Sequence, residues 1–241
     1  SGYYFERMIA LPREGGGDPI NQLTDIIARL RDPAVKARNK FELSVFDPAR
    51  DVDKSPYGGQ CLSFGSFKLR EISFAIPTGG HAVLIGPTAS GKTTLLELIA
   101  GAIDPTSGTV AVNDAEITVL PSELRGVGLV PQHGYLFPHL DARRNIEYGS
   151  KAPGAALDLA RRFDIAHLLD RAVAYLSGGE RQIVALCRAL APQPSVLLLD
   201  EPFSALDAAR RAVTIQQFAE LQAERAFTVL HVTHQESDAA A

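Results

Sequence analysis

The segment GPTASGKT at positions 86–93 constrains this chain more than any other part of its sequence. It matches the pattern GxxxxGK[ST] at every fixed position, and it lies between an apolar run typical of a strand, 82–85, and a stretch typical of a helix, Lys92–Ala100. In such a loop the glycines let backbone amides turn inward around phosphate oxygens, and the following helix directs its positive end at the same anion. An incidental glycine-rich turn is the alternative. The flanking strand and helix favour a nucleotide phosphate site.

The residues of this loop have separate expected roles. Lys92 would contact the β and γ phosphates, Thr93 would offer its hydroxyl to Mg²⁺, and Thr94 would reach the region of the α phosphate. We therefore expect nucleotide contacts from Gly86, Thr88, Ala89, Ser90, Gly91, Lys92, Thr93 and Thr94.

A second motif ends in two acidic residues. The run 196–199 is wholly aliphatic and is followed directly by Asp200 and Glu201. Asp200, at the strand tip beside the phosphate loop, is placed to hold Mg²⁺ through water. Glu201 would point the other way by strand alternation and could polarise a water in line with the γ phosphate. Alone, two acids after a strand more often cap a helix, but together with the loop at 86–93 they indicate a P-loop nucleoside triphosphatase.

The third motif is LSGGERQ at 176–182, which opens a predicted helix. A Ser hydroxyl and glycine amides at a helix N-terminus form an anion receptor, so the chain has a second device that suits phosphate. Ser-Gly-Gly by itself is a common capped turn. The full string at this spacing before Asp200 is much more specific.

With these three motifs, residues from about 61 to 241 resemble the ATP-binding cassette (ABC) family. The resemblance implies that two such domains meet head to tail, and that ATP on the phosphate loop of one is capped by the 176–182 segment of the other. Hydrolysis would then need a dimer, a homodimer in the simplest case. The residues expected to cap the nucleotide are Ser177, Gly178, Gly179 and Gln182.

The same resemblance implies roles for four further residues. Gln132 matches a glutamine that touches Mg²⁺ and the attacking water, and His234 matches a switch histidine that contacts the γ phosphate. Asp207 would lie at the dimer seam, and Phe64 would stack on adenine, although Phe67 is an alternative. The expected catalytic residues are therefore Glu201, His234 and Gln132, and the expected metal ligands are Thr93, Gln132 and Asp200.

The fold expected from these patterns is α/β, a P-loop NTPase fold with a mostly parallel sheet, an antiparallel N-terminal β part and a short helical subdomain at about 133–178. Further strands are predicted at 126–130, 195–199 and 227–232, and further helices at 155–169, 180–190 and Ala208–Arg225. Residues 1–60 are interpreted as an N-terminal extension of unknown role, with a helix at 20–30 and a strand at 41–46. The family's fold usually continues further beyond the switch histidine, so the C-terminus is expected to be truncated.

The segments 131–140 and 145–149 resemble the ATPase subunits of bacterial importers for molybdate, tungstate, sulfate and related solutes. This implies transmembrane permease subunits and a solute-binding protein as partners, and a location on the cytoplasmic face of the cell membrane. Tyr135, Leu136 and Phe137 would either dock a membrane subunit or pack inside the helical subdomain.

Composition narrows the alternatives. Lys and Arg number 24 against 28 Asp and Glu, a net charge of −4, so no nucleic-acid partner is expected. No apolar run approaches the length of a membrane-spanning helix. Two rival functions remain: a soluble ABC ATPase with no role in transport, which the charge and the short helical subdomain disfavour, and a regulatory module that uses ATP merely to dimerise.

Overall fold

The computed structural model describes residues 69, 72–87, 89–105, 108–150 and 152–233, together with two strands nearer the N-terminus, 7–10 and 40–45. No helix in this described part of the chain has both the length and the apolar character needed to cross a bilayer. The predicted helix at 20–30 lies outside it.

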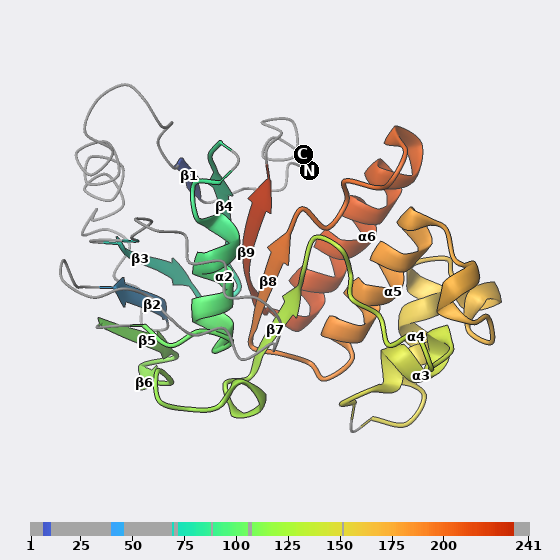
Figure 1. Cartoon of the computed structure of the whole chain (residues 1–241), viewed down its shortest axis with the longest axis horizontal. Coiled ribbons are helices and arrows are strands. Elements are labelled where there is room, and N and C mark those ends of the chain that lie inside the picture. The colour runs from blue at the N-terminus through green and yellow to red at the C-terminus, as the bar shows by residue number, and fades with distance from the viewer. Residues whose placement is uncertain are drawn as a thin grey trace.

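A parallel sheet forms the centre of the molecule (Figure 1). Its strands, in spatial order, are β1 (Arg7–Ala10), β4 (His81–Ile85), β9 (Thr228–Thr233), β8 (Val196–Asp200) and β7 (Val127–Val130), and every neighbouring pair is parallel. The expected strands are thus confirmed to within about two residues. Because parallel strands end at one edge, the loops that follow β4, β7 and β8 open at the same side of the sheet, where α/β folds bind their ligands.

Helices cover both faces of this sheet. β8 shows the arrangement: Val196 and Leu198 pack in one apolar cluster with α2 (Lys92–Ala100), whereas Leu197 and Leu199 pack in another with α5 (Gly178–Leu190) and α6 (Ala208–Arg225). A strand buried on both faces has no reason to alternate apolar and polar residues. This explains the aliphatic run in the sequence and confirms the α/β class.

A second, antiparallel sheet lies beside the first (Figure 1). Its spatial order is β3 (Ile72–Pro77), β2 (Lys40–Val45), β5 (Gly108–Val112) and β6 (Ala115–Glu116). Alternate residues of β3 are buried, as in a sheet with one face on a core. The predicted strand at 41–46 forms β2, and it pairs with β3 on one side and β5 on the other. The first sixty residues therefore contribute one strand to each sheet: β1 to the parallel sheet and β2 to the antiparallel sheet.

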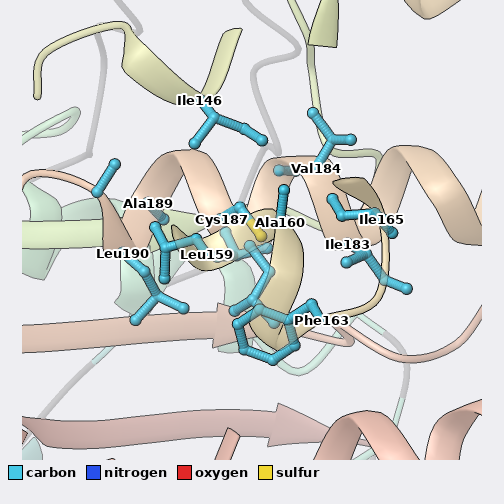
Figure 2. Packing of buried hydrophobic residues seen from close by; sticks show 14 of the residues in the cluster. Ile146, Leu159, Ala160, Phe163, Ile165, Ile183, Val184, Cys187, Ala189 and Leu190 are labelled. Carbon is cyan, nitrogen blue, oxygen red and sulfur yellow. The ribbon is translucent and has the colours of Figure 1, made fainter. Parts of the chain in front are cut away.

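Short helices between β7 and α5 form a compact apolar layer (Figure 2). They are α3 (Ala142–Glu147) and α4 (Ala155–Arg162), followed by 3₁₀ turns η3 (Ala166–Leu168) and η4 (Val173–Tyr175); a further turn, η2 (Ser122–Leu124), precedes β7. The prediction of one helix over 155–169 was wrong. Asp164 takes a left-handed φ of 52°, which ends α4 and turns the chain into η3.

Candidate functional site

The phosphate loop runs from the carboxyl end of β4 to the start of α2. Gly91, the N-cap of α2, has a left-handed φ of 91° and supplies no side-chain cap to the amides of the first turn. Ala89 is also left-handed, with a φ of 64°. The loop therefore has a left-handed conformation at Ala89, an expected nucleotide contact that has a side chain, as well as at Gly91.

Lys92 is buried and folds back over this loop. Its Nζ donates hydrogen bonds to the carbonyl oxygens of Gly86, at 2.8 Å, and Pro87, at 2.7 Å. Burial lowers the pKa of Lys92, and the nearby carboxylates of Glu201 and Asp200 oppose that shift. The ammonium group and the two acids therefore act on one another electrostatically at this edge of the sheet.

Two side-chain contacts connect different elements at the carboxyl edge of the parallel sheet. The Thr93 hydroxyl donates to Asp200 Oδ2 at 2.7 Å, which links the first turn of α2 to the end of β8. Gln132 Nε2 donates to Glu201 Oε2 at 3.3 Å, which links the loop after β7 to the loop after β8. The structure therefore brings together four residues that the sequence analysis assigned to one site: Thr93, Gln132, Asp200 and Glu201.

Glu201 does not continue the strand as expected. β8 ends at Asp200, and Glu201 has a left-handed φ of 49°. Its orientation thus follows from this backbone turn, and strand alternation does not supply it.

The donor set suits Mg²⁺. Hydroxyl, carboxylate and amide oxygens of Thr93, Asp200 and Gln132 are the hard ligands that this ion prefers, and magnesium usually shares them with water and substrate phosphates. Among the described residues no group of three His, Cys, Asp or Glu side chains could hold an ion by itself. A metal here would therefore depend on phosphate oxygens as well.

The 176–182 segment forms the N-terminus of α5. Ser177 Oγ accepts a hydrogen bond from the amide of Glu180 at 3.2 Å, and the Glu180 carboxylate accepts one from the Ser177 amide at 2.6 Å. The second bond lowers the pKa of Glu180. Gly179 packs so closely on the loop after β8 that a Cβ atom would lie 2.8 Å from Leu206 Cδ2. A pocket of about 390 Å³, lined in part by Ser177, Asp207 and Arg210, lies beside this turn.

Gln182 and Asp207 have contacts that the motifs did not reveal. Gln182, expected among the nucleotide contacts, is 6% exposed, and its amide bonds to the loop after Glu201. Asp207 caps α6, where its side chain accepts from the Arg210 amide at 3.0 Å. Phe64, Thr88 and His234 lie outside the described residues.

The segment at 135–137 combines an exposed and a packed part. Tyr135 is 67% exposed, whereas Leu136 packs against the apolar core of the helical layer. The ring of Phe137 packs against that of Tyr148 at a tilt of 46°, with ring centroids 4.4 Å apart, and the Arg188 guanidinium lies 5.2 Å from the centre of the Phe137 ring. Packing inside the helical layer is thus confirmed for Leu136, and docking of a membrane subunit stays a prediction for the exposed Tyr135.

Comparison with known proteins gives a consistent result. The sequence profile described as "ABC transporter" matches residues 69–204. The molybdate/tungstate import ATP-binding protein of Archaeoglobus fulgidus is 49% identical over 166 residues, 66% of this chain and 69% of that protein. The protein of the same description in Thermococcus kodakarensis is 43% identical over 73% of this chain and 56% of its own length. The sulfate/thiosulfate import ATP-binding protein of Vibrio vulnificus is 42% identical over 75% of this chain and 56% of its own length.

Solved structures agree in fold. A dimeric bacterial ABC transporter cassette superposes with a TM-score of 0.65 at 29% identity, covering 71% of this chain and 82% of that one. An ATP-bound bacterial ABC exporter of the Atm1 family superposes with a TM-score of 0.67 at 24% identity, over 91% of this chain and 41% of that one.

Proposed function

This chain belongs to the ABC transporter family, and on that premise we propose that it is the ATP-binding and ATP-hydrolysing subunit of an importer for a small oxyanion. The observation that carries the proposal is the pair of contacts at the carboxyl edge of the sheet, Thr93 with Asp200 and Gln132 with Glu201. The import ATP-binding relatives, described for molybdate/tungstate and sulfate/thiosulfate, support the oxyanion class.

The chain's own groups account for ATP binding. Amides at the start of α2 would bind the phosphate oxygens, and the Lys92 ammonium would move from the loop carbonyls to the β and γ phosphates. Thr93, Asp200 and Gln132 would hold Mg²⁺, which would offset negative charge on the phosphates.

Glu201 is the proposed general base. Its carboxylate would orient a water in line with the γ phosphate and accept a proton from it as the water oxygen bonds to the γ phosphorus. The bond between that phosphorus and the oxygen bridging to the β phosphate would break at the same time, so that ADP leaves with the electron pair. Gln132, which donates to that carboxylate, would help fix its direction. We propose His234 as a further contact to the γ phosphate and Phe64 as the base-stacking residue, both from the sequence resemblance.

A second copy would complete the site. The Ser177 turn is exposed, it offers the N-terminus of a thirteen-residue helix, and a structural relative is a dimeric cassette. Ser177, Gly178 and Gly179 of one copy would therefore contact the nucleotide held by the other, with Asp207 near the seam.

Membrane partners follow from the transporter role. We propose that the exposed side of the surface formed by Tyr135, Phe137 and Tyr148 contacts a permease subunit at the cytoplasmic face of the membrane, and that a solute-binding protein delivers the cargo. The expected result is that the chain co-purifies with a permease and that ATP turnover rises in the assembled complex. Equal turnover with and without the permease would favour a regulatory or non-transport ATPase.

The glutamate substitution Glu201→Gln tests the catalytic assignment. It should lower kcat for ATP hydrolysis by roughly 10²–10⁴-fold, because the amide cannot accept the proton from water, while ATP binding is retained. Glu220→Gln, an exposed change on α6, is the matched control and should leave kcat unchanged. Full turnover in Glu201→Gln would rule out this carboxylate as the base.

A further inference from the structure

The backbone at Glu201 is held in an unusual conformation by several hydrogen bonds. A left-handed φ of 49° is unfavourable for a residue with a Cβ, and such a conformation persists only where the surroundings fix it. The Glu201 amide donates to the Val232 carbonyl at 2.9 Å. The Glu201 carbonyl accepts from the Ser204 hydroxyl at 3.0 Å and from the Ser204 amide at 3.3 Å.

Gln182 adds a third donor to that carbonyl from a different element. This residue lies in the second turn of α5, and its Nε2 donates to the Glu201 carbonyl at 3.3 Å and to Ser204 Oγ at 3.0 Å. Its Oε1 accepts from the Ala205 amide at 2.9 Å. Both functions of the amide group are thus directed at one short loop, 201–205.

Burial makes the hydrogen bonds of Gln182 costly to break. Gln182 is 6% exposed, and its bonds join α5 to a loop that Gly179 also approaches closely. A buried amide that loses its partners leaves polar groups unsatisfied, so the loop and the helix are expected to keep a fixed relative position. Any rotation at Glu201 would also move the carboxylate that Gln132 contacts.

We infer that Gln182 is a positioning residue for hydrolysis. Its buried amide ties α5 to the 201–205 loop and holds the Glu201 carboxylate in place from within the same subunit, and Gln182 does not itself contact nucleotide. This role rests on the proposed function, because it concerns the residue assigned there as the general base.

The test compares two buried glutamines. Gln182→Met keeps the length of the side chain but removes its hydrogen bonds. Gln222→Met is the matched control: Gln222 is 8% exposed, and its amide donates to the carbonyls of Gly79, Gly80 and Phe227, which lie at the other end of β4 and β9. Both variants should lose thermal stability, whereas only Gln182→Met should lower kcat, by roughly 10–100-fold, with KM for ATP within about twofold of the wild type.

A second variant and a second measurement cover the case in which Gln182→Met does not fold. Ser204→Ala removes the hydroxyl that Gln182 and the Glu201 carbonyl share, at an exposed position, and should lower kcat in the same direction by a smaller factor. Hydrogen exchange should speed up at the Ala205 amide in Gln182→Met but not in Gln222→Met.

The outcomes separate the two proposals. If the wild type and Glu201→Gln turn over ATP equally, the proposed base is wrong and the positioning role is lost with it. If Glu201→Gln is inactive but Gln182→Met and Ser204→Ala keep the wild-type kcat, only the role of Gln182 is overturned. A raised KM with an unchanged kcat would indicate a nucleotide contact and would also overturn it.

Discussion

At the scale of single residues, two neighbouring histidines, the buried His231 and the partly buried His81, are expected to make stability depend on pH. His231 and His81 lie on neighbouring strands with ring centroids 5.9 Å apart. Burial lowers the pKa of His231 to about 3, and the nearby His81 adds to that shift. Burial also lowers the pKa of His81 to about 4, although a hydrogen bond with the Gln222 side chain acts in the opposite direction and raises it.

These pKa values fix the sign of the effect. Between the ordinary value of 6.5 and about 4, the unfolded chain binds protons that the folded chain excludes. The free energy of unfolding should therefore fall as the pH falls through that window, by up to about 1.4 kcal/mol per pH unit for each histidine. Urea unfolding of His231→Phe from pH 7 to 5 should show a shallower slope than the wild type. Equal slopes would mean that His231 does not exclude a proton when folded.

Some side-chain contacts of the candidate site could be predicted from the sequence and others could not. The roles of Thr93 and Asp200 followed from motif spacing, because one lies in a loop-to-helix junction and the other at a strand tip, and the structure brings the two side chains together. The inward direction of Gln182 could not be predicted in this way. A polar residue early in an amphipathic helix is compatible with either ligand contact or burial, and its partner loop is distant in sequence.

At the scale of elements, Arg125 fixes the end of α2. It is 4% exposed, and its guanidinium donates to four backbone carbonyls, those of Leu98, Ile99, Thr118 and Leu120. Two of these carbonyls belong to the last turn of α2, where a cation is also favoured by the helix dipole. A Cβ at Gly101 would overlap Arg125 Nε, so the chain leaves no room for a side chain there.

Removing this guanidinium should destabilise the fold. Arg125→Met should lower the free energy of unfolding by about 2–4 kcal/mol, because several buried carbonyls lose their donor. Arg125→Lys keeps the charge with fewer donors and should lose less. Chemical denaturation measures both. A loss below about 0.5 kcal/mol in Arg125→Met would show that water or other groups replace the bonds.

Elements were predictable where their signal is local. The helix Ala208–Arg225 and the helix Lys92–Ala100 have the predicted bounds. The end of α4 was missed because Ile165, Leu168 and Leu169 continue a helical spacing, and a single left-handed residue between them leaves no mark in that pattern. The pairing of β1 and β2 was not predictable, since it depends on strands far along the chain.

For the molecule as a whole, the proposed role of the Ser177 turn leads us to expect a dimer that forms only when ATP is bound. In the Glu201→Gln background, ATP should convert the chain to a dimer measurable by light scattering. Ser177→Asp should prevent this: aspartate still caps the helix, so stability should change by less than about 1 kcal/mol, but its charge would repel a phosphate.

The matched variant is Ser177→Asn, which caps the helix without charge and should still dimerise. Equal dimerisation of the Asp and Asn variants would mean that no phosphate approaches this turn.

The pairing of β1 with β4 and of β2 with β3 and β5 has a practical consequence for anyone shortening this polypeptide. A fragment begun at residue 61, where the recognisable motifs start, would lack one border strand of the first sheet and an inner strand of the second. Unpaired strand edges form hydrogen bonds with other chains, so such a fragment should aggregate when expressed. Protein prepared for biochemical experiments should therefore retain residues 7–45.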